Sequence, residues 1–465
     1  MLKNIFLQEK FYLPTGLFHK EYSPYHLIMH PTRPVWTFVN DFGWQIVRFL
    51  QGDKSFQDIL EILVNEYDVK PEILQRDIED FLVSLKSTGL LEVRERKEDK
   101  PAIFTSCFFH ITDRCNLRCR HCYYPASASG EDHLTDTQIL DYFEAYHNQG
   151  GRGFTLSGGE PLLRNGLVKK VISALKDSTF VILTNGILLD DDTARFFNDH
   201  QVSVQISLDG STSKIHDYIR GKGAYDGAIR GIETLLKYSM HDRVNLCATV
   251  TRHNISDLKN IIALASGLGI HSVRFLPLRK KGRALRGWND LNEGLSAEEC
   301  EAFYDYVFHD AQSEFPDMEI SSGLCGYVLN PEQFDEQGNW CPIGNNLVVD
   351  SRGNAYACVL LMDQKYRLGS IIKNRLEELW QSPVLAELSS ALDERRNKIA
   401  ECRSCLWKNM CQSGCMGLAY DRFDSIWAKD ELCEYRKKIY NRTMTRISEG
   451  KRVFYEHFSC NNTKK

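Results

Sequence analysis

The chain has 465 residues, which is too long for a single small core and typical of two to four domains. Its formal net charge of −5 argues against a nucleic-acid binder that works by neutralising phosphates. The N-terminus lacks an apolar core of signal-peptide length, and no run of about 18 uncharged apolar residues predicts a membrane span. We therefore expect a soluble, cytoplasmic protein without nucleic-acid or membrane partners.

Residues 1–97 are predicted to form a unit of their own. Short strands are expected at 25–30 and 34–39, and Asp53 or Ser55 suits the N-cap of a second helix. The helical patterns run over 43–50, 56–67 and 71–87, and a returning strand is expected after Gly89. The charged segment 98–104 is read as a linker.

Strand and helix patterns alternate over residues 105–284. Six such units predict an α/β fold with parallel strands, a partial (β/α)6 barrel whose functional groups lie after the carboxyl ends of its strands. The helices of this unit are expected near 135–149, 166–177, 189–200, 227–239 and 256–268. The rest of the chain divides into a helical bridge, a cysteine-rich domain with a hairpin across Ser351–Asn354, and a C-terminal tail, at residues 285–324, 325–440 and 441–465.

The 15 cysteines are distributed unevenly, and they suggest metal chemistry because the chain carries no export signal. Cys115, Cys119 and Cys122 are separated by three and then two residues, directly after an apolar strand pattern. A structural zinc site needs four ligands, and no fourth lies in register here. Three thiolates on a short loop can hold three irons of a cubane cluster and leave the fourth iron open to a small molecule.

This motif resembles that of the radical S-adenosylmethionine (SAM) enzymes. The resemblance places His121 near the adenine of SAM, at a position that is usually aromatic in the family. Glycines in Ser157–Pro161 can let the backbone approach a ligand, and the family receives the SAM amino group at this segment. The resemblance implies that the residues contacting SAM are His121, Gly158, Gly159, Glu160, Asn185, Ser207, Asp209 and Arg220.

The chemistry that the resemblance implies is reductive cleavage of SAM to methionine and a 5'-deoxyadenosyl radical, which takes a hydrogen atom from an unactivated substrate carbon. The electron would come from a donor such as flavodoxin or ferredoxin. The sequence assigns no catalytic side chain.

A second cysteine pattern resembles the SPASM domain of radical SAM enzymes that modify peptides and proteins. The resemblance implies two auxiliary clusters with crossed ligation, and hence three [4Fe–4S] clusters in all. It assigns Cys402, Cys405, Cys411 and Cys433 to an outer cluster. It assigns Cys341, Cys358 and Cys415 to an inner one, with Cys325 as candidate fourth ligand or an open iron that binds substrate. A zinc ribbon remains an alternative, because cysteine pairs two residues apart also hold zinc.

The segment from about residue 20 to 96 resembles the small winged-helix domain of the PqqD type, the recognition element for ribosomally made, post-translationally modified peptides (RiPPs). An exposed strand edge can pair with an extended peptide. We expect the leader of a precursor peptide at the edge of strand Pro34–Val39, near Phe81 and Leu85. Proline at Thr37 is then predicted to remove a donor that the leader needs.

Three functions follow from these features. The first is a radical SAM enzyme that modifies a precursor peptide, forming a thioether or carbon–carbon cross-link; epimerisation is a further outcome. The second is an anaerobic sulfatase-maturing, formylglycine-forming type, although that family has an Asp where this chain has Val359 and lacks the N-terminal unit. The third is an iron–sulfur electron-transfer protein, which intact SAM-binding strand ends argue against.

Overall fold

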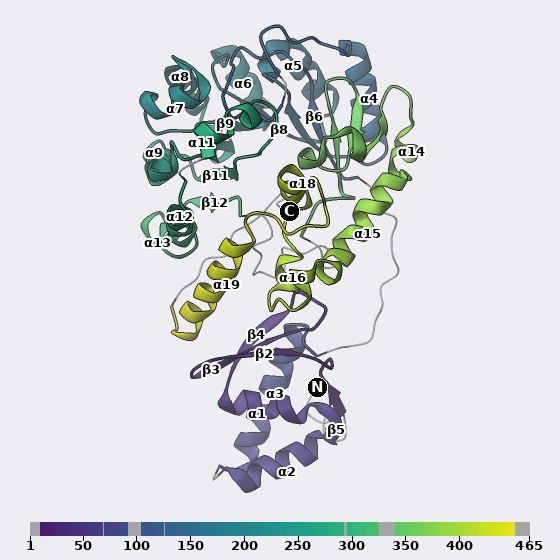
Figure 1. Ribbon diagram of the computed structural model, residues 1–465, viewed down its shortest axis with the longest axis vertical. Helices are drawn as coiled ribbons and strands as arrows, with labels where there is room; N and C mark the ends of the chain where they lie inside the picture. The colour runs from purple at the N-terminus through teal and green to yellow at the C-terminus, as the bar shows by residue number, and fades with distance from the viewer. Residues whose placement is uncertain are drawn as a thin grey trace.

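The computed structural model describes residues 10–67, 69–91, 104–124, 126–292, 295–324 and 340–451. Cys325 and the returning strand expected after Gly89, beyond Leu91, lie outside these residues. Figure 1 shows the purple N-terminal unit at one end of the long axis and the blue and teal sheet with its helices at the other. The green and yellow C-terminal segment lies between the two. The chain therefore returns from the far end to pack beside its own N-terminal unit.

The N-terminal unit is a three-stranded antiparallel sheet beside three helices. The sheet has the order β2-β3-β4, and β2 was not predicted. Ser55 caps the second helix in a capping box with Asp58, and Pro71 opens the third. The elements are β1 (Lys10–Tyr12), β2 (Phe18–Tyr22), β3 (Tyr25–Met29), β4 (Trp36–Asn40), α1 (Asp41–Phe49), β5 (Gln51–Ser55), α2 (Phe56–Glu66) and α3 (Pro71–Ser87).

The two faces of this small sheet belong to different cores. Ile28 and Val39 pack with the helices of the N-terminal unit. Leu27 and Met29 point to the opposite face, as alternation along a strand requires, and join the large core of the rest of the molecule. The N-terminal unit is therefore docked through an apolar sheet face.

The central sheet contains the six parallel strands that the alternating pattern predicts. Along these strands buried residues alternate with less buried ones, because one face meets the outer helices and the other lines the barrel interior. The strands are β6 (Ser106–His110), β7 (Gly153–Ser157), β8 (Thr179–Thr184), β9 (Ser203–Ser207), β10 (Val244–Val250) and β11 (Ser272–Pro277). The helices around them are α4 (Asp136–Asn148), α5 (Asn165–Ala174), α6 (Asp191–Asp199), α7 (Ser213–Arg220), α8 (Ala224–Lys237) and α9 (Leu258–Gly267).

The sheet extends beyond these six strands at both ends, which was not expected. β12 (Glu319–Ser321) adds to β11 in parallel, so the segment read as a helical bridge also contains a strand. β13 (Asn346–Val349) adds in parallel to β6 and forms the expected hairpin with β14 (Asn354–Tyr356), which β15 (Arg367–Ser370) extends. The cysteine-rich segment thus shares one ten-stranded sheet with the barrel.

The remaining elements are helices of the bridge and of the cysteine-rich segment. The last long helix runs over Cys433–Ser448 and contacts α12, so the chain expected as a tail from residue 441 is helical as far as Ser448. Among the described residues, no helix is both long and apolar enough to cross a membrane. The helices are α10 (Arg283–Arg286), α11 (Trp288–Asn292), α12 (Ala297–His309), α13 (Ala311–Glu314), α14 (Leu376–Trp380), α15 (Pro383–Lys398), α16 (Ala400–Arg403), α17 (Lys408–Cys411), α18 (Met416–Phe423) and α19 (Cys433–Ser448).

Candidate functional site

Cys115, Cys119 and Cys122 lie on the loop that follows β6, at the carboxyl end of the barrel strands. Cys115 and Cys119 are buried and Cys122 is half-buried. Burial is the main reason that the pKa of Cys115 is raised to about 12 and that the pKa of Cys119 is also raised. The neighbouring cysteines contribute to both shifts in the same direction. Thiols in such a place stay protonated unless a cation displaces the proton, which is the behaviour of metal ligands.

Arg283 of α10 holds this loop in place, and sequence reasoning did not single it out. Its Nε donates to the Cys119 carbonyl at 2.8 Å and its Nη1 to the Ala126 carbonyl at 2.5 Å. Its backbone N–H donates to the Cys122 carbonyl at 2.8 Å. The shape of the cysteine loop therefore depends on a residue far away in the sequence.

The glycines after β7 bring the backbone against the cysteine loop itself. The N–H of Gly159 donates to the Thr112 carbonyl and that of Glu160 to the Arg114 carbonyl, both at 2.8 Å. A Cβ at Gly159 would overlap the Arg114 carbonyl. The absence of a side chain at Gly159 therefore allows the backbone after β7 to approach the cysteine loop closely.

Glu160 is almost completely buried, and its carboxylate joins two neighbouring strand ends. It accepts hydrogen bonds from the Thr184 hydroxyl at 2.6 Å, the Asn185 N–H at 2.9 Å and the Leu162 N–H at 3.1 Å. Burial raises its pKa, and the hydrogen bonds from Asn185, Thr184 and Leu162 oppose that rise. The side chain of Asn185 also donates to the Asn116 side chain in the cysteine loop at 2.7 Å.

Asp209 lies in contact with two other predicted SAM-binding residues, Arg220 and His121. Its carboxylate accepts from Arg220 Nε at 2.6 Å and from the Thr249 N–H at 2.7 Å, and lies 3.1 Å from His121 Nε2. Burial alone would raise its pKa, but Arg220 and His121 lower it overall, so Asp209 is ionised. Ser207 lies at the end of β9, two residues before Asp209.

The guanidinium of Arg220 connects Asp209 to the cysteine thiols. Its Nη1 lies 3.9 Å from the Cys119 sulfur and its Nη2 lies 3.4 Å from His121 Nε2. Burial disfavours its charge, but Asp209 raises its pKa overall and keeps it cationic. The buried His121 Nδ1 has no hydrogen-bond partner among the described residues. A thiolate cluster beside a fixed cation, with one free ring nitrogen nearby, fits an iron–sulfur cluster and a polar ligand such as SAM.

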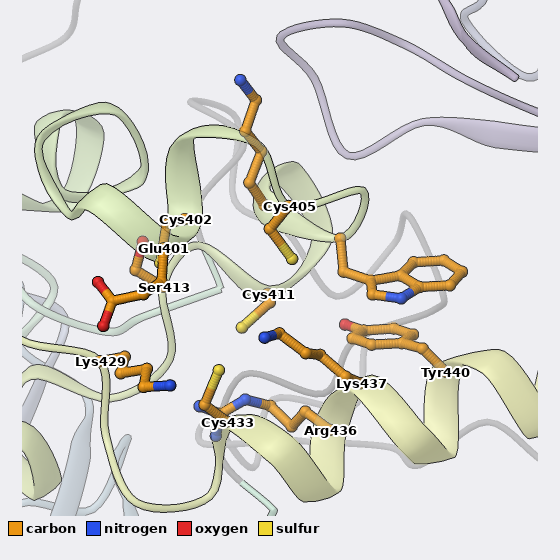
Figure 2. A pocket seen from close by; sticks show the side chains of 12 residues that line it. Glu401, Cys402, Cys405, Cys411, Ser413, Lys429, Cys433, Arg436, Lys437 and Tyr440 are labelled. Atoms are coloured by element: carbon orange, nitrogen blue, oxygen red, sulfur yellow. The ribbon is translucent and has the colours of Figure 1, made fainter.

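Four other thiols line one cavity in the C-terminal segment (Figure 2). They come from α16, the turn after it, α17 and the first residue of α19, and are Cys402, Cys405, Cys411 and Cys433. The sulfur atoms of Cys405, Cys411 and Cys433 point toward one another in Figure 2. Burial raises the pKa of all four thiols. Four thiols around one cavity are the donor set of an iron–sulfur cluster.

Zinc is the alternative occupant suggested by the cysteine spacing. Within the described parts of the chain, no three His, Cys, Asp or Glu side chains are close enough together to hold a single metal ion.

Three further predicted ligands, Cys341, Cys358 and Cys415, lie in the same C-terminal segment. Burial, and to a smaller extent the nearby Cys415 thiol, raise the pKa of Cys358 to about 12. Cys341 and Cys415 both act electrostatically on Arg395, which is buried and donates to the carbonyls of Gly414 at 2.9 Å and Ser413 at 3.1 Å. The loop from Cys411 to Cys415 thus carries one predicted ligand of each auxiliary cluster.

A buried ion pair connects the barrel to the C-terminal segment, and sequence reasoning missed it. Arg279 donates to Asp421 through Nε at 2.7 Å and Nη2 at 3.1 Å. It also donates to the carbonyls of Val359 at 3.1 Å and Leu360 at 2.8 Å. Its guanidinium lies 4.8 Å from the ring centre of Tyr123, the residue after Cys122. The first cysteine loop and the segment after Cys358 are therefore fixed relative to each other.

Three protein families match successive parts of the chain. Residues 25–91 match coenzyme PQQ synthesis protein D (PqqD), residues 109–265 the radical SAM superfamily, and residues 341–406 the SPASM iron–sulfur cluster-binding domain. The chain therefore contains a domain that matches the radical SAM superfamily. It combines a radical SAM barrel with an N-terminal PqqD-type domain and a C-terminal SPASM domain.

Individual relatives and solved structures are similar to large parts of the chain. The mycofactocin maturase MftC of Mycolicibacterium smegmatis is 28% identical over 343 residues, which are 71% of this chain and 82% of the relative. The serine-type anaerobic sulfatase-maturating enzyme of Klebsiella pneumoniae is 27% identical over 340 residues, 66% of this chain and 81% of the relative. SuiB of Streptococcus suis, solved with S-adenosylmethionine, has the same fold with a TM-score of 0.58 and 14% identity, over 91% of this chain and 100% of SuiB.

Proposed function

We propose that this chain is a radical SAM enzyme that modifies a ribosomally made precursor peptide and forms a thioether or carbon–carbon cross-link in it. The observation that carries the proposal is a PqqD-type sheet, with one edge open, in the same chain as a SAM-type cysteine loop and a four-thiol cavity. The similarity to a mycofactocin maturase adds support, since that relative is a maturase by name.

The proposed cofactors are SAM and three [4Fe–4S] clusters. Cys115, Cys119 and Cys122 would hold the SAM-binding cluster, whose reduction of SAM supplies a radical that abstracts hydrogen. The outer auxiliary cluster would be held by Cys402, Cys405, Cys411 and Cys433, and the inner one by Cys341, Cys358, Cys415 and the candidate Cys325. A reduced flavodoxin or ferredoxin is the proposed electron donor.

The residues around the first cysteine loop would bind SAM in this scheme. The Asp209–Arg220 pair keeps a charged guanidinium beside Cys119, where it offsets the negative charge of thiolates. Glu160 and Asn185 are held at adjoining strand ends, and His121 presents an unpartnered Nδ1. These side chains are fixed by the fold before any ligand binds, which reduces the ordering cost of binding.

The open edge of β4 is the proposed leader-binding site. The other edge strand, β2, lies against α19: Lys20 Nζ donates to the Asn441 side chain at 3.0 Å and the Tyr22 hydroxyl to the same atom at 3.4 Å. Among the described residues, no strand pairs with the outer edge of β4. An extended peptide could therefore add to this edge of β4.

One of the two α3 residues that we expected to contact the leader, Leu85, does not lie at the surface. Leu85 is buried in the core of the N-terminal unit, so it stabilises the domain and does not present a surface to a leader. Phe81 is half-buried against that core and remains a candidate contact.

A sulfatase-maturing enzyme is the second candidate function, on the strength of the similarity to the Klebsiella relative. The position after Cys358 has no carboxylate in this chain: Val359 stands there, and its carbonyl accepts from Arg279. The precursor-peptide function is therefore preferred.

The experiment that tests the first proposal replaces Cys115, Cys119 and Cys122 together with Ala. Three cubane clusters imply about 12 iron atoms per chain, and the triple variant should lose about four of them. It should also lose cleavage of SAM to 5'-deoxyadenosine under dithionite. Cys300→Ala, which removes a thiol of α12 without a proposed role, is the control and should retain both. Full SAM cleavage by the triple variant would contradict the radical SAM assignment.

A further inference from the structure

The sheet of the N-terminal domain packs against the segments that carry residues of the four-thiol cavity. Leu27 and Met29 of β3 are fully buried, and they belong to the same continuous apolar core as Trp407 and Tyr440. The rings of Trp407 and Tyr440 stack with centroids 4.7 Å apart, and both residues line the cavity. Separating the N-terminal domain would therefore expose apolar surface next to the proposed outer cluster.

Polar contacts link the same surfaces. The Asn409 side chain is buried and its Nδ2 donates to the His30 carbonyl at 3.0 Å. Lys408, which also lines the cavity, places its Nζ 5.5 Å from the ring centre of Phe18 in β2. In Figure 2 the purple ribbon of the N-terminal domain passes on the Cys405 side of the cavity.

These contacts fall on the segments that carry the proposed cluster ligands. Asn409 lies in α17 between Cys405 and Cys411. Tyr440 lies two turns along α19 from Cys433. We therefore expect a movement of the cysteine-bearing segments on metal loading to displace β2 and the turn between β3 and β4.

The turn between β3 and β4 connects this contact to the open edge. His30 donates its N–H to the Val35 carbonyl at 2.8 Å, at the start of β4. Arg33 donates from Nη2 to the Gly89 carbonyl at 2.7 Å, so the turn is also attached to the end of α3. Asn409 thus contacts the turn that leads into β4, the strand whose edge is proposed to receive the peptide.

We propose that the peptide-recognition sheet and the outer cluster site are energetically coupled, so that each stabilises the other. This inference rests on the proposed function, because it assumes that the four thiols hold a cluster. Coupling of this kind is reciprocal: a chain that loses the outer cluster should have a looser recognition sheet, and a chain with a loosened interface should lose the cluster more easily.

Hydrogen–deuterium exchange of the full-length, iron-loaded chain tests the coupling without any peptide. Cys405→Ala removes one ligand of the outer cluster and Asn409→Ala removes the contact to His30. Asn65→Ala, on α2 at the far side of the N-terminal domain, is the matched control. Exchange is compared in residues 18–40 and, as an internal reference, in residues 56–66.

Cys405→Ala should lack about four iron atoms. Its residues 18–40 should exchange about fivefold or more faster than those of the loaded wild type, with little change at 56–66. Equal exchange at 18–40, with the iron loss confirmed, would overturn the coupling. If Cys405→Ala holds as much iron as the wild type, the outer-cluster assignment fails instead, and the proposed function is then what has to be revised.

Asn409→Ala keeps every proposed cluster ligand. It therefore tests the coupling between the recognition sheet and the outer cluster site even if Cys405→Ala unfolds as a whole. Its iron should be released to a chelator about fivefold or more faster than the iron of Asn65→Ala. The same release rate in both variants would show that the contact to His30 carries no coupling.

Discussion

At the scale of single residues, the proposed SAM site is built from groups that are buried, charged and already paired. Asp209 is fully buried and ionised because Arg220 and His121 face it, and Arg220 is kept cationic by Asp209 next to the Cys119 thiol. Breaking a buried pair of this kind on one side leaves an uncompensated charge, which costs several kcal/mol. The pair therefore acts as one unit that positions a cation beside the cysteine loop.

The glycine pair after β7 gives a sharp test at this scale. In Gly159→Ala the new Cβ would overlap the Arg114 carbonyl, so the cysteine loop must move. We expect a loss of about 1–3 kcal/mol from overpacking, together with loss of about four iron atoms. Gly166→Ala is the matched control, because a Cβ there meets nothing within 4 Å. Iron content and SAM binding distinguish the two variants, and equal values for both would show that the loop tolerates the displacement.

The sequence predicts the cysteines of the first loop as one group, whereas it gives no sign of the arginines that support the loop. Cys115, Cys119 and Cys122 are close in the sequence, and their spacing reflects a single loop. Arg279 and Arg283 act on that loop or beside it from more than 150 residues further along the chain. An arginine far away in the sequence has no local signal that marks its partner.

At the scale of elements, the helices and parallel strands of the barrel follow their sequence patterns, since period and capping are local properties. The pairing of β13 with β6 is different, because it joins segments 240 residues apart. Nothing in the strand pattern at 346–349 distinguishes a barrel neighbour from a separate hairpin. β2 was not predicted as a strand at all, because its three middle residues are exposed and give no alternating apolar pattern.

The ladder between β3 and β4 determines which residues could receive a leader. His30 and Val35 are a hydrogen-bonded pair, and such pairs alternate along an antiparallel ladder. The N–H of Thr37 therefore points to Ile28 in β3, whereas those of Trp36 and Phe38 point outward. Proline at Thr37, suggested by the sequence alone, would damage the sheet instead of the proposed binding edge.

Phe38→Pro is the better test of the edge. It removes an outward donor and leaves the β3–β4 ladder in place, so the leader of the candidate precursor should bind about five- to tenfold more weakly. Thr37→Pro should instead lower the stability of the N-terminal domain by more than about 1 kcal/mol. Fluorescence anisotropy with labelled leader and urea unfolding separate the two effects. Undiminished leader affinity in Phe38→Pro would place the peptide elsewhere on the protein.

At the scale of the whole molecule, the N-terminal domain is docked as well as tethered. The sequence suggested an independent module joined by a charged linker, because amphipathic strands do not show what covers their second face. In the structure that second face, with Leu27 and Met29, packs into the core that holds Trp407 and Tyr440 (Figure 1). The domain that would capture the peptide is thus part of the support of the C-terminal segment.

Deletion of residues 1–97 should therefore do more than weaken peptide binding. Removing the domain uncovers apolar side chains beside the four-thiol cavity and removes the partner of the buried Asn409 side chain. Because cluster binding and local folding are coupled, we expect the truncated chain to hold about eight iron atoms instead of about 12. It should still cleave SAM, since the first cysteine loop is fixed by Arg283 and by the strand ends of the barrel. The control is full-length Asn65→Ala, which changes a residue of α2 and leaves the docked sheet unaltered, so it should keep all of its iron. A truncated chain with the full iron content and an unchanged rate of iron release would show that the N-terminal domain is an independent module, as the sequence alone suggests.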